Sequence, residues 1–341
     1  MNTFDRNSVI YVAGHRGLAG SAIYRALKRA GYANVIGESR QRLDLTQAHA
    51  VDRFFDQARP EVVILAAAKV GGIIANSTQP AEFIFNNLLI QTSVIDAAHR
   101  YGVSKFVFLG SSCIYPRAAP QPMREEYLFN GELEPTNDAY AVAKLAGIKM
   151  CQAYRRQYGL DAVSVLPTNL YGPHDNFSEL GSHVIPGLIR RMHDASVAGD
   201  SEFRVWGSGA PRREFLHADD FAEAVITVLE RYSDSAPINI GTGEDVTIAE
   251  LAGVVRNVVG LEAPLTFDAS KPDGMPRKLL DVARICKLGW KPRISLREGL
   301  EQTYRWYCAN LASPPPVSRG HMLPAAGGLR IAMTSPLVAA P

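Results

Sequence analysis

The chain has 341 residues, of which 47% are hydrophobic and 21% charged, a balance typical of one large or two medium globular domains with a buried core. Lys and Arg number 36 and Asp and Glu 34, so the net charge of +2 excludes the global basic field of proteins that bind nucleic acid or membrane surfaces. The longest apolar run, 62–68, is far short of the ~20 residues that span a bilayer. Without an apolar leader or closely paired cysteines, the sequence predicts a cytoplasmic protein with reduced thiols and no metal site.

Strands and helices alternate along the chain. Short apolar, β-branched runs that predict strands lie at 8–14, 35–36, 62–68, 106–109, 162–166 and 238–240. Segments with helical spacing lie between them at 21–30, 47–57, 83–100 and 140–158. Parallel strands need crossover connections of this length. The pattern therefore predicts an α/β fold, a Rossmann-like doubly wound parallel sheet with helices on both faces.

The composition of the chain changes after residue 167, where the predicted loops are rich in Gly, Pro and His. We predict a dinucleotide-binding domain that consists of residues 8–170 and about 215–245. A smaller α/β substrate-binding domain is expected from about 171–214 and 246–312. The segment 313–341 is rich in Pro, Ala and Gly without periodicity and is predicted to be a flexible tail.

A glycine-rich turn joins the first predicted strand to the first predicted helix. Its glycines have the spacing G-x-x-G-x-x-G, at the place where backbone can approach a pyrophosphate at a helix N-terminus. Glycines also occur in such turns for their backbone freedom alone, but the position after the first strand of an alternating pattern favours a dinucleotide. The expected contacts are Gly14, His15, Arg16, Gly17, Leu18, Ala19 and Gly20.

The end of the second predicted strand gives a mixed signal for the choice of cofactor. An acidic residue there binds the ribose 2′-hydroxyl of NAD, whereas an arginine accommodates the 2′-phosphate of NADP. The sequence has both, Glu38 and Arg40. Arg16 and Arg40 could clamp the phosphate together, while Glu38 could face the ribose or be a solvated surface charge.

Tyr140 and Lys144 are four residues apart and therefore lie on one face of a helix. A fixed ammonium favours a phenolate, which suits proton transfer, although such a pair also occurs by chance as a core aromatic and a solvated lysine. Ser111 follows the strand at 106–109, and doubly wound sheets bind ligands at the carboxyl ends of their strands. The three residues together predict a catalytic site.

In this order, the glycine turn, Ser111, Tyr140 and Lys144 resemble the extended short-chain dehydrogenase/reductase family, from about residue 9 to 307. Many further blocks resemble the nucleotide-sugar epimerase-reductases of that family, which makes chance an unattractive explanation. These blocks are residues 14–17, 67–73, 110–116, 134–137, 167–173, 182–186, 205–209 and 271–274.

The resemblance implies an NADP(H)-dependent bifunctional enzyme. It would epimerise GDP-4-keto-6-deoxy-D-mannose at C3 and C5 and then reduce C4 with hydride to give GDP-L-fucose. Ser111 and Tyr140 would donate to the C4 oxygen, and Lys144 would hold the nicotinamide ribose. For the base and acid that inversion requires, the resemblance nominates Cys113 and His183. A buried thiol and a histidine that caps or packs are the alternatives.

The resemblance also implies binding residues and an assembly. Further cofactor contacts are expected from Leu109, Gly110, Lys144, Pro167, Thr168, Asn169, Leu170 and His183. Substrate contacts are expected from Arg191, Trp206, Arg213 and Asp273. Arginine forks match phosphate oxygens, whereas a tryptophan could equally belong to the core. Guanosine rests on the resemblance alone, as does a helix-mediated homodimer.

Other functions stay open at this stage. A 4,6-dehydratase of the family carries an Asp-Glu pair where this chain has Ser112 and Cys113. A 4-epimerase would lack the pair of Cys113 and His183 and would retain its NAD, and a simple 4-reductase would need no such pair. A non-catalytic dinucleotide sensor would not require Ser111, Tyr140 and Lys144 together. Net consumption of the cofactor distinguishes the epimerase-reductase from the 4-epimerase, and steady oxidation of NADPH by the ketosugar distinguishes it from the sensor.

Overall fold

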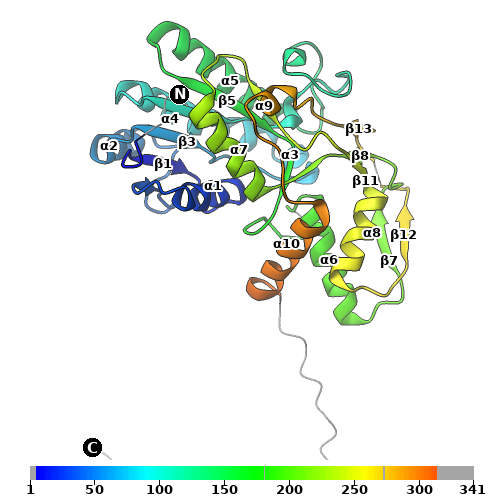
Figure 1. Ribbon diagram of the computed structural model, residues 1–341. Coiled ribbons are helices and arrows are strands. Elements are labelled where there is room, and N and C mark those ends of the chain that lie inside the picture. Colours follow the sequence, from blue (N-terminus) through cyan, green and yellow to red (C-terminus); the bar gives the residue numbers. More distant parts are fainter. Residues whose placement is uncertain (1–4, 180, 272, 313–341) are drawn as a thin grey trace, which may run out of the picture.

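The computed structural model describes residues 5–179, 181–271 and 273–312. At its centre is a six-stranded sheet with the order β10-β5-β4-β3-β1-β2 (Figure 1). Every pairing in it is parallel, which confirms the predicted doubly wound α/β fold. The strands are β1 (Ile10–Ala13), β2 (Val35–Ile36), β3 (Val62–Leu65), β4 (Lys105–Leu109), β5 (Ala162–Pro167) and β10 (Ile238–Ile240).

Helices cover both faces of this sheet. On one face, α1 (Leu18–Arg29) and α7 (Ala218–Arg231) pack with Ile10 and Val12 of β1. On the other, Tyr11 and Ala13 pack with the remaining layer. Since successive strand residues point to opposite faces, a strand covered on both sides is apolar at every position. The second layer consists of α2 (Ala48–Ala58), α4 (Pro80–Arg100) and α5 (Asp138–Tyr158).

A second, smaller group of elements lies beside the sheet (Figure 1). It has its own apolar core, to which Ile189, Val205, Leu251 and Leu300 contribute. Its helices are α6 (Val184–Ala198), α8 (Ile248–Val259) and α10 (Leu296–Asn310). Its strands are β7 (Phe203–Trp206) paired with β12 (Leu265–Asp268), and β8 (Arg212–Arg213) between β11 (Val246–Thr247) and β13 (Arg277–Lys278).

Short elements connect the two groups. β6 (Asn169–Tyr171) pairs in parallel with β9 (Phe215–His217). The remaining helices are α3 (Ile73–Thr78) and α9 (Ala283–Lys287), with 3-10 turns at Ser112–Ile114 and Glu125–Tyr127. The predicted domain boundaries stay a prediction, and the predicted flexible tail at 313–341 lies outside the described residues.

Local sequence signals set the ends of several helices. Thr247 begins α8 and Ser295 begins α10, and each forms a capping box with the glutamate three residues later. Gly159 ends α5 with φ of 75°, a conformation that glycine adopts without strain. Among the described helices, none is long and apolar enough to cross a membrane.

Candidate active site

A cavity of about 680 Å³ opens at the carboxyl edge of the central sheet. Gly14, Ala66, Gly110 and Thr168 line it, and each directly follows a strand, namely β1, β3, β4 and β5. β2 pairs with one side of β1 and β3 with the other, so the connections diverge here to opposite faces of the sheet. Ligands of doubly wound folds bind at this switch point.

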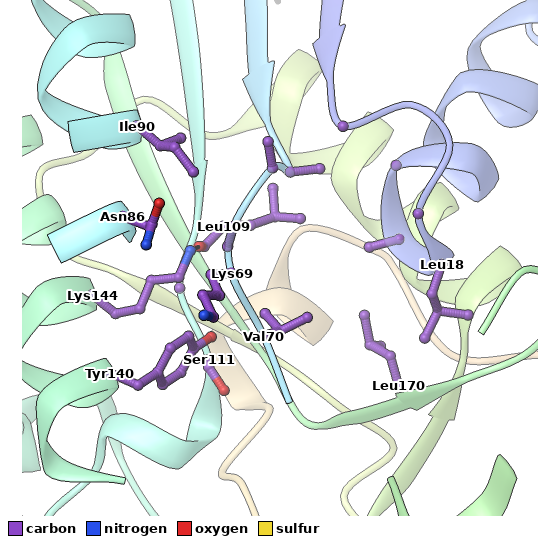
Figure 2. A pocket seen from close by; sticks show the side chains of 18 of the residues that line it. Leu18, Lys69, Val70, Asn86, Ile90, Leu109, Ser111, Tyr140, Lys144 and Leu170 are labelled. Carbon is purple, nitrogen blue, oxygen red and sulfur yellow. Dashed lines mark hydrogen bonds between the residues drawn. The ribbon is translucent and has the colours of Figure 1, made fainter. Parts of the chain in front are cut away.

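Most of the predicted site residues line this one cavity. They are Gly14, Gly17, Leu18, Ala19, Gly20, Arg40, Leu109, Gly110, Ser111, Cys113, Tyr140, Lys144, Pro167, Thr168, Asn169, Leu170 and His183. Figure 2 shows Tyr140 and Lys144 extending from one helix toward Ser111, with Leu18 and Leu170 across the cavity. Residues that are far apart in sequence thus meet where the sequence predicted a site.

Gly14 and Gly20 in the glycine turn have no space for a side chain. Gly14 has φ of 86°, and a Cβ there would lie 2.8 Å from the backbone nitrogen of Ala67. A Cβ on Gly20 would lie 2.1 Å from the carbonyl oxygen of Gly14. Gly17 immediately precedes α1, so the N–H groups of the first helical turn are directed to the cavity. This arrangement fits a pyrophosphate at the helix N-terminus.

His15 and Arg16, which were also predicted to contact the cofactor, lie beside the cavity lining. A Cβ on Gly37 would lie 2.4 Å from the His15 ring, so the ring packs against the backbone after β2. Burial lowers the pKa of His15, and its Nδ1 has no hydrogen-bond partner within the described residues. The Arg16 side chain is exposed.

Glu38 and Arg40 both line the cavity, so the acidic and the basic residue that bear on the choice of cofactor are both at the site. Glu38 Oε2 lies 3.4 Å from Arg42 Nε, and Arg40 Nε lies 3.9 Å from Asp44 Oδ2. Arg42 was not among the predicted site residues. Its i, i+4 spacing from Glu38 is the signal that could have identified it. The pairing offsets the negative charge of Glu38 close to Arg40.

Lys144 is buried and fixed by the end of β4. Its Nζ donates to the carbonyl oxygen of Leu109 at 2.8 Å and lies 4.9 Å from the centre of the Phe108 ring. Burial lowers the pKa of Lys144 to about 8. α5 can approach β4 this closely because a Cβ on Gly147 would lie 2.3 Å from Phe108.

Figure 2 shows the Tyr140 phenol beside the Ser111 side chain. Burial raises the pKa of Tyr140, and the nearby Cys113 acts in the same direction. That Lys144 favours the phenolate stays a prediction, and burial of the hydroxyl acts in the opposite direction. The phenol therefore keeps its proton at neutral pH, as a proton donor must.

Cys113 and His183 line the cavity from different elements. Cys113 follows Ser111 in the 3-10 turn, where its backbone N–H donates to Ser111 Oγ at 3.1 Å. His183 precedes α6, and burial lowers its pKa, which favours the neutral imidazole. Neutral His183 accepts a proton, and it can act as an acid only after it has been protonated.

The predicted substrate residues gather on the smaller group of elements. The Arg191 guanidinium carbon of α6 lies 4.9 Å from the ring centres of both Phe203 and Trp206. Trp206 is 53% exposed, so it is not a core residue. Asp273 accepts hydrogen bonds from the backbone N–H and the hydroxyl of Ser208, each at 2.7 Å.

Arg213 lies in β8, and its guanidinium is close enough to Cys113 to interact with it electrostatically. Burial lowers the pKa of Arg213. The next residue, Glu214, is fully buried and accepts from the backbone N–H groups of Gly243 at 2.7 Å and Leu280 at 3.0 Å. Arg213 thus connects the substrate residues to the cavity, and Glu214 fixes the strand beneath it.

Comparisons with known proteins agree with this geometry. The model of the NAD dependent epimerase/dehydratase family matches residues 10–241. The chain is 56% identical to GDP-L-fucose synthase 1 of Arabidopsis thaliana over 91% of this chain and 96% of the relative. It is 53% identical to the GDP-L-fucose synthase of Escherichia coli K12, over 88% and 97%. The solved GDP-L-fucose synthetase of Naegleria fowleri bound to NADP superposes with a TM-score of 0.83 at 28% identity, over 90% of this chain and 96% of that chain.

Proposed function

Because the chain belongs to the NAD dependent epimerase/dehydratase family and, within it, to the GDP-L-fucose synthases, we propose that it converts GDP-4-keto-6-deoxy-D-mannose to GDP-L-fucose. The predicted family and enzyme class are confirmed by these relatives, and the alternative functions are not favoured. One observation is the main support for this reaction. A single cavity beside the glycine turn is lined by the side chains of Ser111, Tyr140, Lys144, Cys113 and His183. Oxidation of NADPH on addition of the ketosugar tests it.

The residues that line the cavity fit NADP(H). Gly14 and Gly20 let the turn pack closely against the backbone after β3 and the start of α1, and α1 directs its first N–H groups to the cavity. Arg40 supplies a cation at the end of β2, while Arg42 offsets Glu38. When bound, the cofactor supplies the hydride for reduction at C4. Lys144, buried beside the end of β4, is the residue we assign to the nicotinamide ribose.

In the epimerisations, the chain's own residues move protons beside the C4 ketone. Removal of the proton at C3 or C5 leaves the electron pair of that C–H bond in a double bond to C4. The π pair of the carbonyl moves to the C4 oxygen, where Ser111 and Tyr140 donate hydrogen bonds. Cys113 takes the proton on one face, and protonated His183 returns a proton on the other. In the reduction, Tyr140 gives its phenolic proton to the same C4 oxygen.

Binding of the nucleotide diphosphate is assigned to the residues beside the cavity. Arg213 and Arg191 match phosphate oxygens with two donors each. Exposed Trp206 offers its ring to the nucleotide or sugar, and Asp273 offers a carboxylate to a hydroxyl. These roles, the two-domain division and the contacts of the glycine turn remain parts of the proposal.

Arg40→Ala is expected to raise the KM for NADPH by about tenfold and to leave the KM for NADH nearly unchanged. The reason is that only NADPH carries the 2′-phosphate that Arg40 would neutralise, and one charge-assisted contact at an exposed site is worth roughly 1.5 kcal/mol. Steady-state kinetics with both cofactors measure it. An equal change for both, or none for NADPH, would remove Arg40 from the phosphate site.

We further propose a cytoplasmic homodimer that pairs through α4 and α5. Phe85 on α4 and Val142 on α5 are large exposed apolar side chains on two helices that pack together. The four described cysteines are free thiols, which suits a reducing compartment. Light scattering is expected to give the mass of two chains, and the mass of one would contradict the dimer.

A further inference from the structure

Cys113 has a cationic neighbour from a distant part of the chain. Lys278 Nζ donates to Cys113 Sγ at 3.9 Å, although the two residues are 165 positions apart in sequence. β13 pairs in parallel with β8, with Lys278 opposite Arg213. Residues opposite each other in a ladder project to the same face of the sheet. Lys278 and Arg213 therefore approach the thiol together.

Two hydrogen bonds hold the backbone next to Lys278 in place beside the site. The N–H of Leu279 donates to Gln121 Oε1 at 2.8 Å, and the N–H of Leu280 donates to Glu214 Oε2 at 3.0 Å. Glu214 is fully buried. Both anchors follow Lys278 directly in the chain, so its Cα has a fixed position relative to the turn that holds Cys113.

The titratable groups near Cys113 have roles in the proposed reaction, with the exception of Lys278. Tyr140 on α5 interacts with the thiol and is the proton donor, and Lys144 and His183 line the same cavity with assigned roles. Arg213 is assigned to the diphosphate. Lys278 is the cation in hydrogen-bonding contact with the sulfur that the reaction scheme does not use.

We propose that Lys278 is a positioning residue that holds Cys113 in its thiolate form, ready to take the protons at C3 and C5. This rests on the proposed function. In each step the C–H bond breaks, the thiolate takes the proton to form the S–H bond, the C–H electron pair forms a double bond to C4, and the carbonyl π pair moves to the C4 oxygen. The thiol releases this proton to solvent before the next step. The Lys278 ammonium keeps its own proton throughout and acts by its charge. Only the thiolate is nucleophilic and basic, which is why such a charge matters.

Alkylation of Cys113 by iodoacetamide as a function of pH measures its thiolate directly, with no substrate present. Lys278→Met is expected to move the midpoint of this profile to higher pH by about one unit, and so to slow alkylation about tenfold at pH values below both midpoints. Lys278→Arg should restore the profile. Mass spectrometry of the Cys113 peptide gives the rate, and exposed Cys308 in the same sample is an internal control.

Lys291→Met, which removes an exposed lysine between α9 and α10, controls for loss of one positive charge and should leave the profile in place. If Lys278→Met does not fold by circular dichroism, Lys278→Gln replaces it. An unchanged profile together with a raised KM for the sugar nucleotide would make Lys278 a diphosphate ligand and overturn the proposal. A shifted profile in Lys278→Met, together with no GDP-L-fucose formation by the unmodified chain, would support the pairing and refute the proposed function instead.

Discussion

Cys113→Ser is expected to abolish formation of GDP-L-fucose while hydride transfer continues. The hydroxyl of serine is a far weaker acid than a thiol, which ionises near pH ~8.5, so its conjugate base is scarce at neutral pH. Loss of a general base slows a step by roughly 10²–10⁴-fold. Ser111, Tyr140 and Lys144 remain in place, so the unepimerised ketosugar should be reduced to a GDP-6-deoxyhexose that retains its original configuration at C3 and C5. NMR of the product sugar measures this.

A control variant and a second test variant accompany that experiment. Cys308→Ser, at an exposed position on α10, should behave as the unmodified chain. His183→Asn should also yield little product of the fucose configuration, because it removes the group that returns the proton on the other face. GDP-L-fucose formed by Cys113→Ser at a normal rate would eliminate Cys113 as the base.

Tyr140→Phe is expected to lower the rate of C4 reduction by roughly 10²–10⁴-fold while the fold is retained. The ring stays, but the proton that neutralises the C4 oxygen is lost. Because burial raises the pKa of Tyr140, the phenol is protonated throughout the neutral range. The loss should therefore be equally large from pH 6 to pH 8. Stopped-flow measurement of NADPH oxidation gives the rate.

Tyr154→Phe is the matched control on the same helix. Tyr154 donates its hydroxyl to Asp96 of α4 at 3.0 Å, and we assign it no part in catalysis. The same loss of one hydroxyl from α5 should leave reduction nearly unchanged there. Near-normal reduction by Tyr140→Phe would show that the C4 oxygen takes its proton from another group.

The fold could be predicted from the sequence because its central strands are buried on both faces and so read as continuous apolar runs. The errors lie at boundaries. The predicted strand at 62–68 ends at Leu65, since Ala66, Ala67 and Ala68 line the cavity. The first helix begins at Leu18, three residues before the predicted start, because Gly20 lets the helix begin close against Gly14.

The site could be predicted only where its residues follow strands or share a helix. Tyr140 and Lys144 meet Ser111 because α5 packs on β4, which the alternating pattern implies. Lys278 could not be found this way. Its contact with Cys113 depends on β13 pairing with the two-residue strand β8, and no periodicity marks so short a strand. The raised pKa of Tyr140 also comes from burial, which spacing does not reveal.

In the proposed mechanism, one cavity performs two proton exchanges and one hydride transfer on the same sugar. The most direct test is turnover of GDP-4-keto-6-deoxy-D-mannose with NADPH in deuterated water, followed by NMR of the product. We predict GDP-L-fucose with deuterium at both C3 and C5 and equimolar oxidation of NADPH. A reduced sugar without deuterium at either carbon, or turnover that leaves NADPH untouched, would contradict the account.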